Sequence, residues 1–75
     1  MNEIVSEKFG LYRVTIHQHE EGDFGWGIEY LDEDGSQFGC EGNGKAYPTG
    51  YMALKHALLR LAELFWQDLE AIAGN

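Results

Sequence analysis

The chain is short of cysteine and of positively charged residues, and each shortage excludes a class of protein. Cys40 is the only cysteine among the 75 residues, so no internal disulfide can form and we expect a reducing, cytoplasmic setting. Five Lys and Arg stand against thirteen Asp and Glu. Because phosphate recognition needs clustered cations, this imbalance argues against nucleic acid as a direct ligand.

Long apolar runs are also missing. No stretch approaches the roughly 18 consecutive apolar residues of a membrane-spanning helix. The shortage of Lys and Arg also argues against binding to an anionic membrane surface, so we expect no contact with a membrane. The opening residues MNEIVSEKFG lack the basic start and the apolar centre of a signal peptide. A chain this short forms one small domain and buries only about 60% of its unfolded surface, so dimerisation would be a natural supplement to its stability.

Negative charge is concentrated in one part of the chain. Between His17 and Glu41 there are eight carboxylates and no Lys or Arg, which accounts for the whole net charge of −8. The same segment carries apolar residues such as Trp26 and Ile28, which a disordered acidic tail would lack. We therefore expect one anionic surface on a folded β-hairpin. The carboxylates expected to contact a partner are Glu20, Glu21, Asp23, Asp32, Glu33 and Asp34.

Alternating apolar and polar residues predict an α+β domain that begins with a three-stranded antiparallel sheet, in strand order 1-2-3. The sheet covers residues 9–41, and residues 1–8 are expected to be a polar lead-in. The three strands are expected at 9–17, 24–31 and 36–41.

Turn residues separate these strands. Gly22 supplies the turn after the first strand, and Asp34 followed by Gly35 predicts a primed hairpin turn after the second. In the third strand, alternation predicts that Phe38 and Cys40 lie on the inner face.

A glycine-rich loop over residues 42–48 leads into one long helix over residues 49–74. Pro48 disfavours a helical conformation for the residue before it, and Thr49 is a good N-cap. No breaker follows until Gly74, which is well placed to end the helix. At 1.5 Å per residue the helix is roughly 36 Å long, and we expect it to pack across the sheet.

Two faces of this helix carry large apolar residues. The stripe expected on the sheet consists of Leu54, Leu58, Leu61, Phe65, Leu69 and Ile72. We expect it to pack against Val14, Ile16, Trp26 and Ile28. A second stripe consists of Met52, Leu59 and Trp66. Either Trp66 folds back over the sheet edge, or the second stripe is a surface for self-association or for a partner. His56 is expected in solvent.

Few residues suggest chemistry. His17 and His19 lie near carboxylates in sequence, but their spacing alone is a weak metal pattern, and we expect both to be exposed. Cys40, expected to face inward, is predicted to be an inert buried thiol. The segment from Gly39 to Lys45 approximates a phosphate-binding loop, but Ala46 replaces its hydroxyl residue. We therefore expect no catalytic residue, no metal ligand and no cofactor.

The order of three strands, a glycine-rich loop and a long helix resembles the later part of double-stranded-RNA-binding domains over residues 9–66. The loop and the alanine-rich helix start of that family are similar to Gly42-Asn43-Gly44-Lys45 followed by Ala53, Ala57 and Leu58. The resemblance implies the scaffold and not RNA binding. Where the family has its basic cluster, this chain has Pro48, Thr49, Gly50, Tyr51 and Met52.

Size, acidity and element order also resemble small phage-encoded inhibitors of bacterial defence, including anti-CRISPR proteins. That resemblance implies a protein target, often a basic nucleic-acid channel. HicB-type antitoxins share a comparable element order.

Two functions of different kinds remain open. The first is a non-enzymatic protein-binding module of phage or prophage origin, whose acidic hairpin imitates nucleic acid and occupies a basic groove on a host protein. The second is a dimerising structural or regulatory module, antitoxin-like, whose acidity serves solubility. The expected partners are accordingly a protein with a basic surface or a second copy of the chain.

Overall fold

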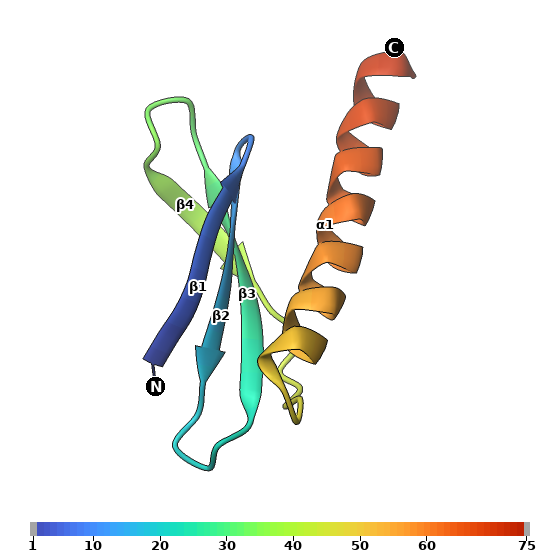
Figure 1. Ribbon diagram of the computed structural model, residues 1–75. Helices are drawn as coiled ribbons and strands as arrows, with labels where there is room; N and C mark the ends of the chain where they lie inside the picture. Colours follow the sequence, from blue (N-terminus) through green and yellow to red (C-terminus); the bar gives the residue numbers. More distant parts are fainter. Residues whose placement is uncertain (1, 75) are drawn as a thin grey trace.

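The computed structural model describes residues 2–74 and shows a four-stranded antiparallel sheet with one long helix on one face (Figure 1). The elements are β1 (Asn2–Phe9), β2 (Tyr12–Gln18), β3 (Phe24–Leu31), β4 (Gln37–Glu41) and α1 (Gly50–Ala73). The sheet order is β1-β2-β3-β4, and α1 packs on β2 and β3. The α+β class and the single C-terminal helix are confirmed, whereas the prediction of three strands was wrong.

The additional strand is β1, which the sequence predicted as a polar lead-in. All of its residues are exposed except half-buried Val5, so it lacks the buried face by which alternation identifies a strand. Backbone pairing with β2 along its whole length holds it in place, with a bulge between Glu3 and Val5. Charged residues such as Glu7 and Lys8 suit an edge strand, because they discourage pairing with another chain.

The two acidic turns share one construction. In each, the N–H of a glycine donates to the carbonyl three residues earlier at 3.0 Å, and that glycine, Gly22 or Gly35, has a positive φ of 94° or 89°. Within residues 2–74 no other residue type has a positive φ, so Asp34 does not adopt the conformation that a primed Asp-Gly turn requires. The predicted primed turn was therefore wrong, and a left-handed glycine closes a longer turn instead.

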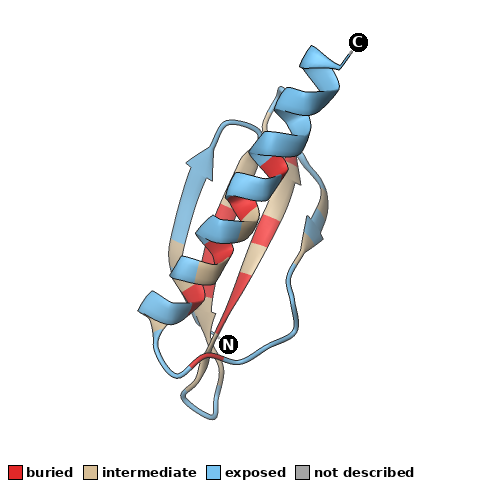
Figure 2. Cartoon of the chain, turned by 90° about the vertical axis from the view of Figure 1, so that its right-hand side faces the viewer, coloured by how far each residue is buried: buried red, intermediate tan, exposed pale blue. Residues whose placement is uncertain are grey.

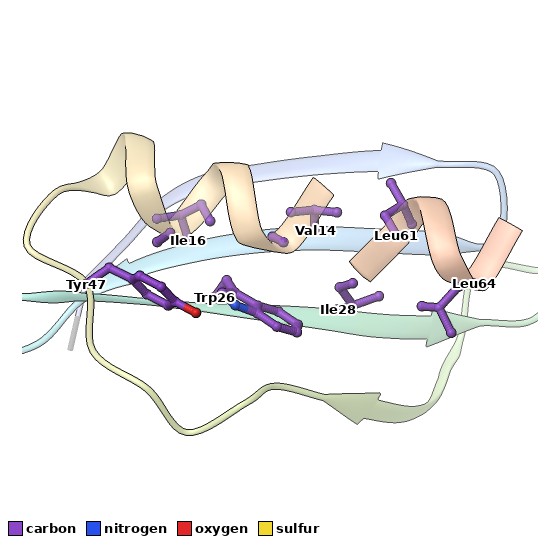
Figure 3. Packing of buried hydrophobic residues seen from close by; sticks show 9 residues of the cluster. Val14, Ile16, Trp26, Ile28, Tyr47, Leu61 and Leu64 are labelled. Atoms are coloured by element: carbon purple, nitrogen blue, oxygen red, sulfur yellow. The ribbon is translucent and has the colours of Figure 1, made fainter. Parts of the chain in front are cut away.

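The core lies between α1 and the two central strands (Figure 3). From the sheet it contains the four predicted residues Val14, Ile16, Trp26 and Ile28. At one end Tyr47 closes the core, because its backbone pairs with Phe24 through two hydrogen bonds of 2.8 Å. The ring of His56 stacks on Tyr47 with centroids 4.8 Å apart, so His56 is half-buried and not in solvent as predicted.

The helix presents a different face to the sheet from the one predicted. Its buried residues are Ala53, Ala57, Leu61 and Leu64. Of the predicted core positions only Leu61 is buried, while Leu58 and Phe65 are exposed. Alanines allow α1 to approach the bulky side chains of the sheet, and close packing of large against small residues outweighs the number of leucines on a face.

Burial along α1 is confined to its first part (Figure 2). Thr49 caps its start by accepting a hydrogen bond from the N–H of Met52 at 3.1 Å, and Gly74 is the C-terminal cap, as predicted. Within residues 2–74, no helix combines the length and the apolar character needed to span a membrane.

The strand β4 also turns its other face to the helix. Phe38 and Cys40, predicted to face inward, are both exposed, while Gly39 and Glu41 stand opposite helix-facing residues of β3. Glu41 reaches α1, where Arg60 donates two hydrogen bonds to its carboxylate at 2.6 and 3.1 Å. The β3–β4 pairing has a register shift between Tyr30 and Leu31, opposite Gly39 and Gln37, so simple alternation does not hold along β4. Glu41 therefore takes the inward position predicted for Cys40, while Phe38 is exposed at the end of the strand and packs on Tyr30.

Candidate functional site

The acidic residues occupy two separate turns. The β2–β3 turn carries Glu20, Glu21 and Asp23. The β3–β4 turn carries Asp32, Glu33 and Asp34. These turns lie at opposite ends of β3, which spans roughly 23 Å at about 3.3 Å per residue (Figure 1). Since the Debye length is about 8 Å at physiological ionic strength, the two turns act as independent negative sites, and the expected single anionic surface is divided in two.

Local hydrogen bonds, and no cations, hold the carboxylates of the β3–β4 turn. The N–H of Ser36 donates to Asp32 Oδ1 at 3.0 Å and to Asp34 Oδ1 at 2.8 Å. Hydrogen bonds with Asp32 and Ser36 lower the pKa of Asp34 to about 2, so it is ionised at neutral pH. In the described part of the chain, no Lys or Arg lies within ion-pair distance of this turn. Its negative charge is therefore available to a partner.

Beside this turn, the sheet and the C-terminal half of α1 enclose an open groove of about 830 Å³. The 24 residues of α1 span roughly 36 Å, whereas the longest strands span roughly 23 Å, so the helix extends past the sheet. Every residue from 65 to 74 is exposed, and Figure 1 shows this end of α1 standing away from the strands. We call this feature the apolar groove; its apolar lining includes Leu11, Tyr30, Phe38, Leu64, Ala71 and Ile72.

One wall of the apolar groove is fixed by Tyr12. Its hydroxyl donates to Asp68 Oδ2 at 2.7 Å, and its ring meets Phe65 edge to face with centroids 5.4 Å apart. Burial and the hydrogen bond to Asp68 raise the pKa of Tyr12 to about 12, so the hydroxyl remains a donor at neutral pH. This contact ties the overhanging part of α1 to β2.

A second anchor ties α1 to β4. Tyr30 and Arg60 both donate to the carboxylate of Glu41, which is half-buried beneath the helix. The hydrogen bonds from Arg60, assisted by that from Tyr30, lower the pKa of Glu41, although burial opposes them. The ring of Tyr30 also packs against Phe38 with centroids 6.0 Å apart. With both anchors in place, the groove is formed before any partner binds.

The rim of the apolar groove is negative. Asp32, Glu33 and Asp68 stand among its lining residues, and none of those residues is Lys or Arg. The last turn of α1 carries no basic residue, and the partial negative charge at a helix C-terminus adds to the field there. Lys8 and Arg13 lie at the same end of the sheet, but on its opposite face, where Arg13 pairs with Glu29 at 3.1 Å.

The second stripe of α1 lies outside the groove. Trp66 is 61% exposed, Leu59 57% and Met52 37%, and none of the three lines the groove. Trp66 does not fold back over the sheet edge, so the structure leaves these apolar side chains on the outer face of the helix.

The remaining sequence candidates do not form a reactive site. His17 and His19 lie against the backbone of Gly25, where a Cβ would come within 2.7 Å of His17 Nε2, and Asp23 holds the His19 ring at 2.5 Å. Burial and the neighbouring His19 lower the pKa of His17. Residues 2–74 contain no group of three or more His, Cys, Asp and Glu arranged to hold a metal ion.

The thiol of Cys40 is exposed, which corrects the prediction of a buried one. Cys40 stands opposite Glu29, and Glu29 stands opposite Arg13, four residues along β2 from His17. At about 3.3 Å per residue, roughly 13 Å along the strand direction separates the thiol from that imidazole, so the two do not form a nucleophile–base pair.

The groove residues Phe38, Asp68 and Ile72 were not singled out from the sequence as binding residues. The available signal was a difference in length, because a helix of roughly 36 Å cannot be covered by strands of five to eight residues. No family model, curated protein or solved structure matches the chain, so the geometry described above is the basis for assigning a function.

Proposed function

We propose that this chain is a non-enzymatic protein-binding module whose partner presents a basic surface. A phage or prophage inhibitor that occupies the nucleic-acid-binding groove of a host protein is the setting that fits this description. The observation that carries the proposal is that Glu20 and Glu21 in one acidic turn, and Asp32, Glu33 and Asp34 in the other, are exposed and lack ion pairs to Lys or Arg, within the residues that the structure describes. Asp23 is half-buried and contacts His19 instead.

The division of the charge limits how such a partner binds. A surface that engages both turns must extend about 23 Å or more, which is the approximate length of β3. A smaller basic patch would engage one turn only. A nucleic-acid-binding groove is long enough to contact both turns, while the exposed carboxylates supply electrostatic steering.

Neutralising the two turns tests the proposal. The variant Glu20→Gln, Glu21→Gln, Asp32→Asn, Glu33→Gln and Asp34→Asn retains hydrogen-bond acceptors for Ser36, so it should fold. A partner captured from bacterial lysate by the wild type is then titrated with both proteins at increasing salt. We expect the wild type to compete with DNA or RNA for that partner, and to associate more slowly as the Debye length falls from about 30 Å at 0.01 M to about 10 Å at 0.1 M.

The neutralised variant should lose this affinity and this competition. If it competes as well as the wild type while remaining folded by circular dichroism, the acidity serves solubility and the proposal is wrong.

A second candidate is a dimerising structural or regulatory module. The observation that favours it is the outer stripe of α1, where Met52, Leu59 and Trp66 are exposed although Trp and Met are typical of interface cores. In this case a second copy would cover the stripe, and sedimentation would detect the dimer.

A further inference from the structure

The apolar groove indicates the chemistry of a partner more specifically than either acidic turn does alone. We propose that it is the docking site for a cationic amphipathic helix of a partner protein. This inference rests on the proposed function and deepens it, since it names where the partner binds and what it presents.

The lining requires apolar anchors from the partner. Phe38 is 72% exposed and Ile72 is 77% exposed, and they belong to different elements that line the groove. The volume of about 830 Å³ is within the range of pockets that bury most of a ligand's surface. An amphipathic helix supplies such anchors in a row, at every third or fourth residue.

The backbone of the neighbouring strands favours a helix over an extended peptide. Both β2 and β3 are paired on each side, so they have no free edge to which a strand could add. A segment that enters an apolar groove must satisfy its own backbone N–H and C=O groups. A helix does so internally, whereas the free backbone of β4 lies along the outer edge of the sheet.

The rim selects positive charge. Asp32, Glu33 and Asp68 border the groove without a lining cation, and the C-terminus of α1 adds to the negative field. Lys or Arg on the polar face of the partner helix would meet these carboxylates. A second copy of this chain is disfavoured as the occupant, because its net charge is −8 and its own helix carries Glu63 and Glu70.

Synthetic peptides of about 20 residues, roughly 30 Å long as helices, test the groove directly. One peptide has Leu at helical spacing and Lys elsewhere. A scrambled isomer has the same composition without an apolar face, and a third peptide has Glu in place of Lys. Affinity is measured by titration calorimetry at about 0.15 M salt, and the site is mapped by amide chemical shifts. We expect only the first peptide to bind tightly, with shifts at Leu11, Tyr30 and Phe38.

Two matched double variants separate the groove from the rest of the surface. Ile72→Ala with Glu33→Gln changes the groove, whereas Leu69→Ala with Glu70→Gln makes a similar change at exposed positions of α1 that do not line it. The groove variant should weaken binding by at least about tenfold, and the control by less than about twofold. Circular dichroism checks that both remain folded.

The outcomes distinguish this inference from the function on which it rests. Equal weakening by the two variants, shifts confined to the outer face of α1, or equal binding of the scrambled isomer would each overturn the groove as the site and leave a basic partner in place. If neither Lys peptide binds even at about 0.01 M salt, where the Debye length is about 30 Å, both the groove site and the proposed function are wrong.

Discussion

Leu61→Ala and Leu59→Ala make the same chemical change two residues apart on α1, and the structure predicts different costs for them. Leu61 is 4% exposed in the core, whereas Leu59 is 57% exposed on the outer face. Both changes replace Leu by the better helix former Ala, so the effect of helix propensity cancels between them. The difference in unfolding free energy therefore measures burial.

The magnitude follows from transfer and packing. Burying a leucine side chain fully contributes about 1.5–3 kcal/mol, and the cavity left by truncation brings the usual cost of Leu→Ala to about 2–5 kcal/mol. Folding removes less than half of the Leu59 surface from water and leaves no enclosed cavity there. We expect Leu61→Ala to cost at least about 2 kcal/mol and Leu59→Ala less than about 1 kcal/mol. In a domain of this size, about 2 kcal/mol lowers Tm by roughly 8–16 °C.

Urea unfolding followed by far-ultraviolet circular dichroism measures both costs. A small domain has only about 3–5 kcal/mol of stability, so Leu61→Val, at about 1 kcal/mol, is included as a milder variant that stays folded. Each titration is repeated at two protein concentrations, because a dimer through the outer face would make the Leu59 effect depend on concentration. Equal costs for the two alanine variants at both concentrations would show that the assigned helix face is wrong.

Three further predictions concern other parts of the molecule. If the outer stripe of α1 mediates dimerisation, Trp66→Ala should raise the monomer fraction in sedimentation without loss of fold; a wild type that is monomeric at high concentration refutes this. Because Arg60 lowers the pKa of Glu41, ionised Glu41 stabilises the fold above its ordinary pKa of 4.5, and this contribution is lost as the pH falls. The difference in unfolding free energy between wild type and Glu41→Gln should therefore shrink below about pH 4.5, and a constant difference would contradict the ion pair. Gly10 has φ 62°, and a Cβ there would meet only Phe65 at 3.8 Å, so Gly10→Ala should cost about 1–2 kcal/mol through backbone strain alone, with recovery when D-alanine is incorporated instead.

Local sequence signals predicted the central elements well. The alternation of Val14 and Ile16 identified β2, and that of Trp26 and Ile28 identified β3, because each strand has one buried face. Thr49 marked the start of α1 through its cap.

The edge strands were predicted poorly because most of their side chains are exposed, so neither strand shows the apolar–polar alternation of a half-buried strand. β1 pairs through its backbone and exposes nearly all of its side chains, so its composition resembles that of a loop. The sequence did contain a signal for the turn between β1 and β2, because glycine followed by another residue, here Gly10 and Leu11, is typical of a two-residue hairpin turn. In β4, the bond from Arg60 to Glu41 shows which face is inward, and that bond joins residues 19 positions apart.

The sequence predicted which acidic residues are candidates for binding, but it did not predict how they are arranged in space. Clustering in sequence revealed the acidic residues, yet a meander places its successive turns at opposite ends of the sheet, so Glu20 and Glu33 do not share a surface. The groove beside Glu33 depends on side chains from four separate elements, β2, β3, β4 and α1, and no pattern within one element predicts such a site.

The sequence by itself determined what adjacent residues control: the turns with their glycines, the two central strands, the bounds of the helix and the total charge. Only the tertiary structure decided which face of α1 is buried, which way β4 turns and where the groove lies. These features depend on how closely the helix packs on the sheet and on the difference in length between the helix and the strands. Ala53 and Ala57 allow α1 to pack close to the sheet, and the last turns of α1 extend past the end of the sheet. Packing between segments that are distant in sequence therefore forms the groove.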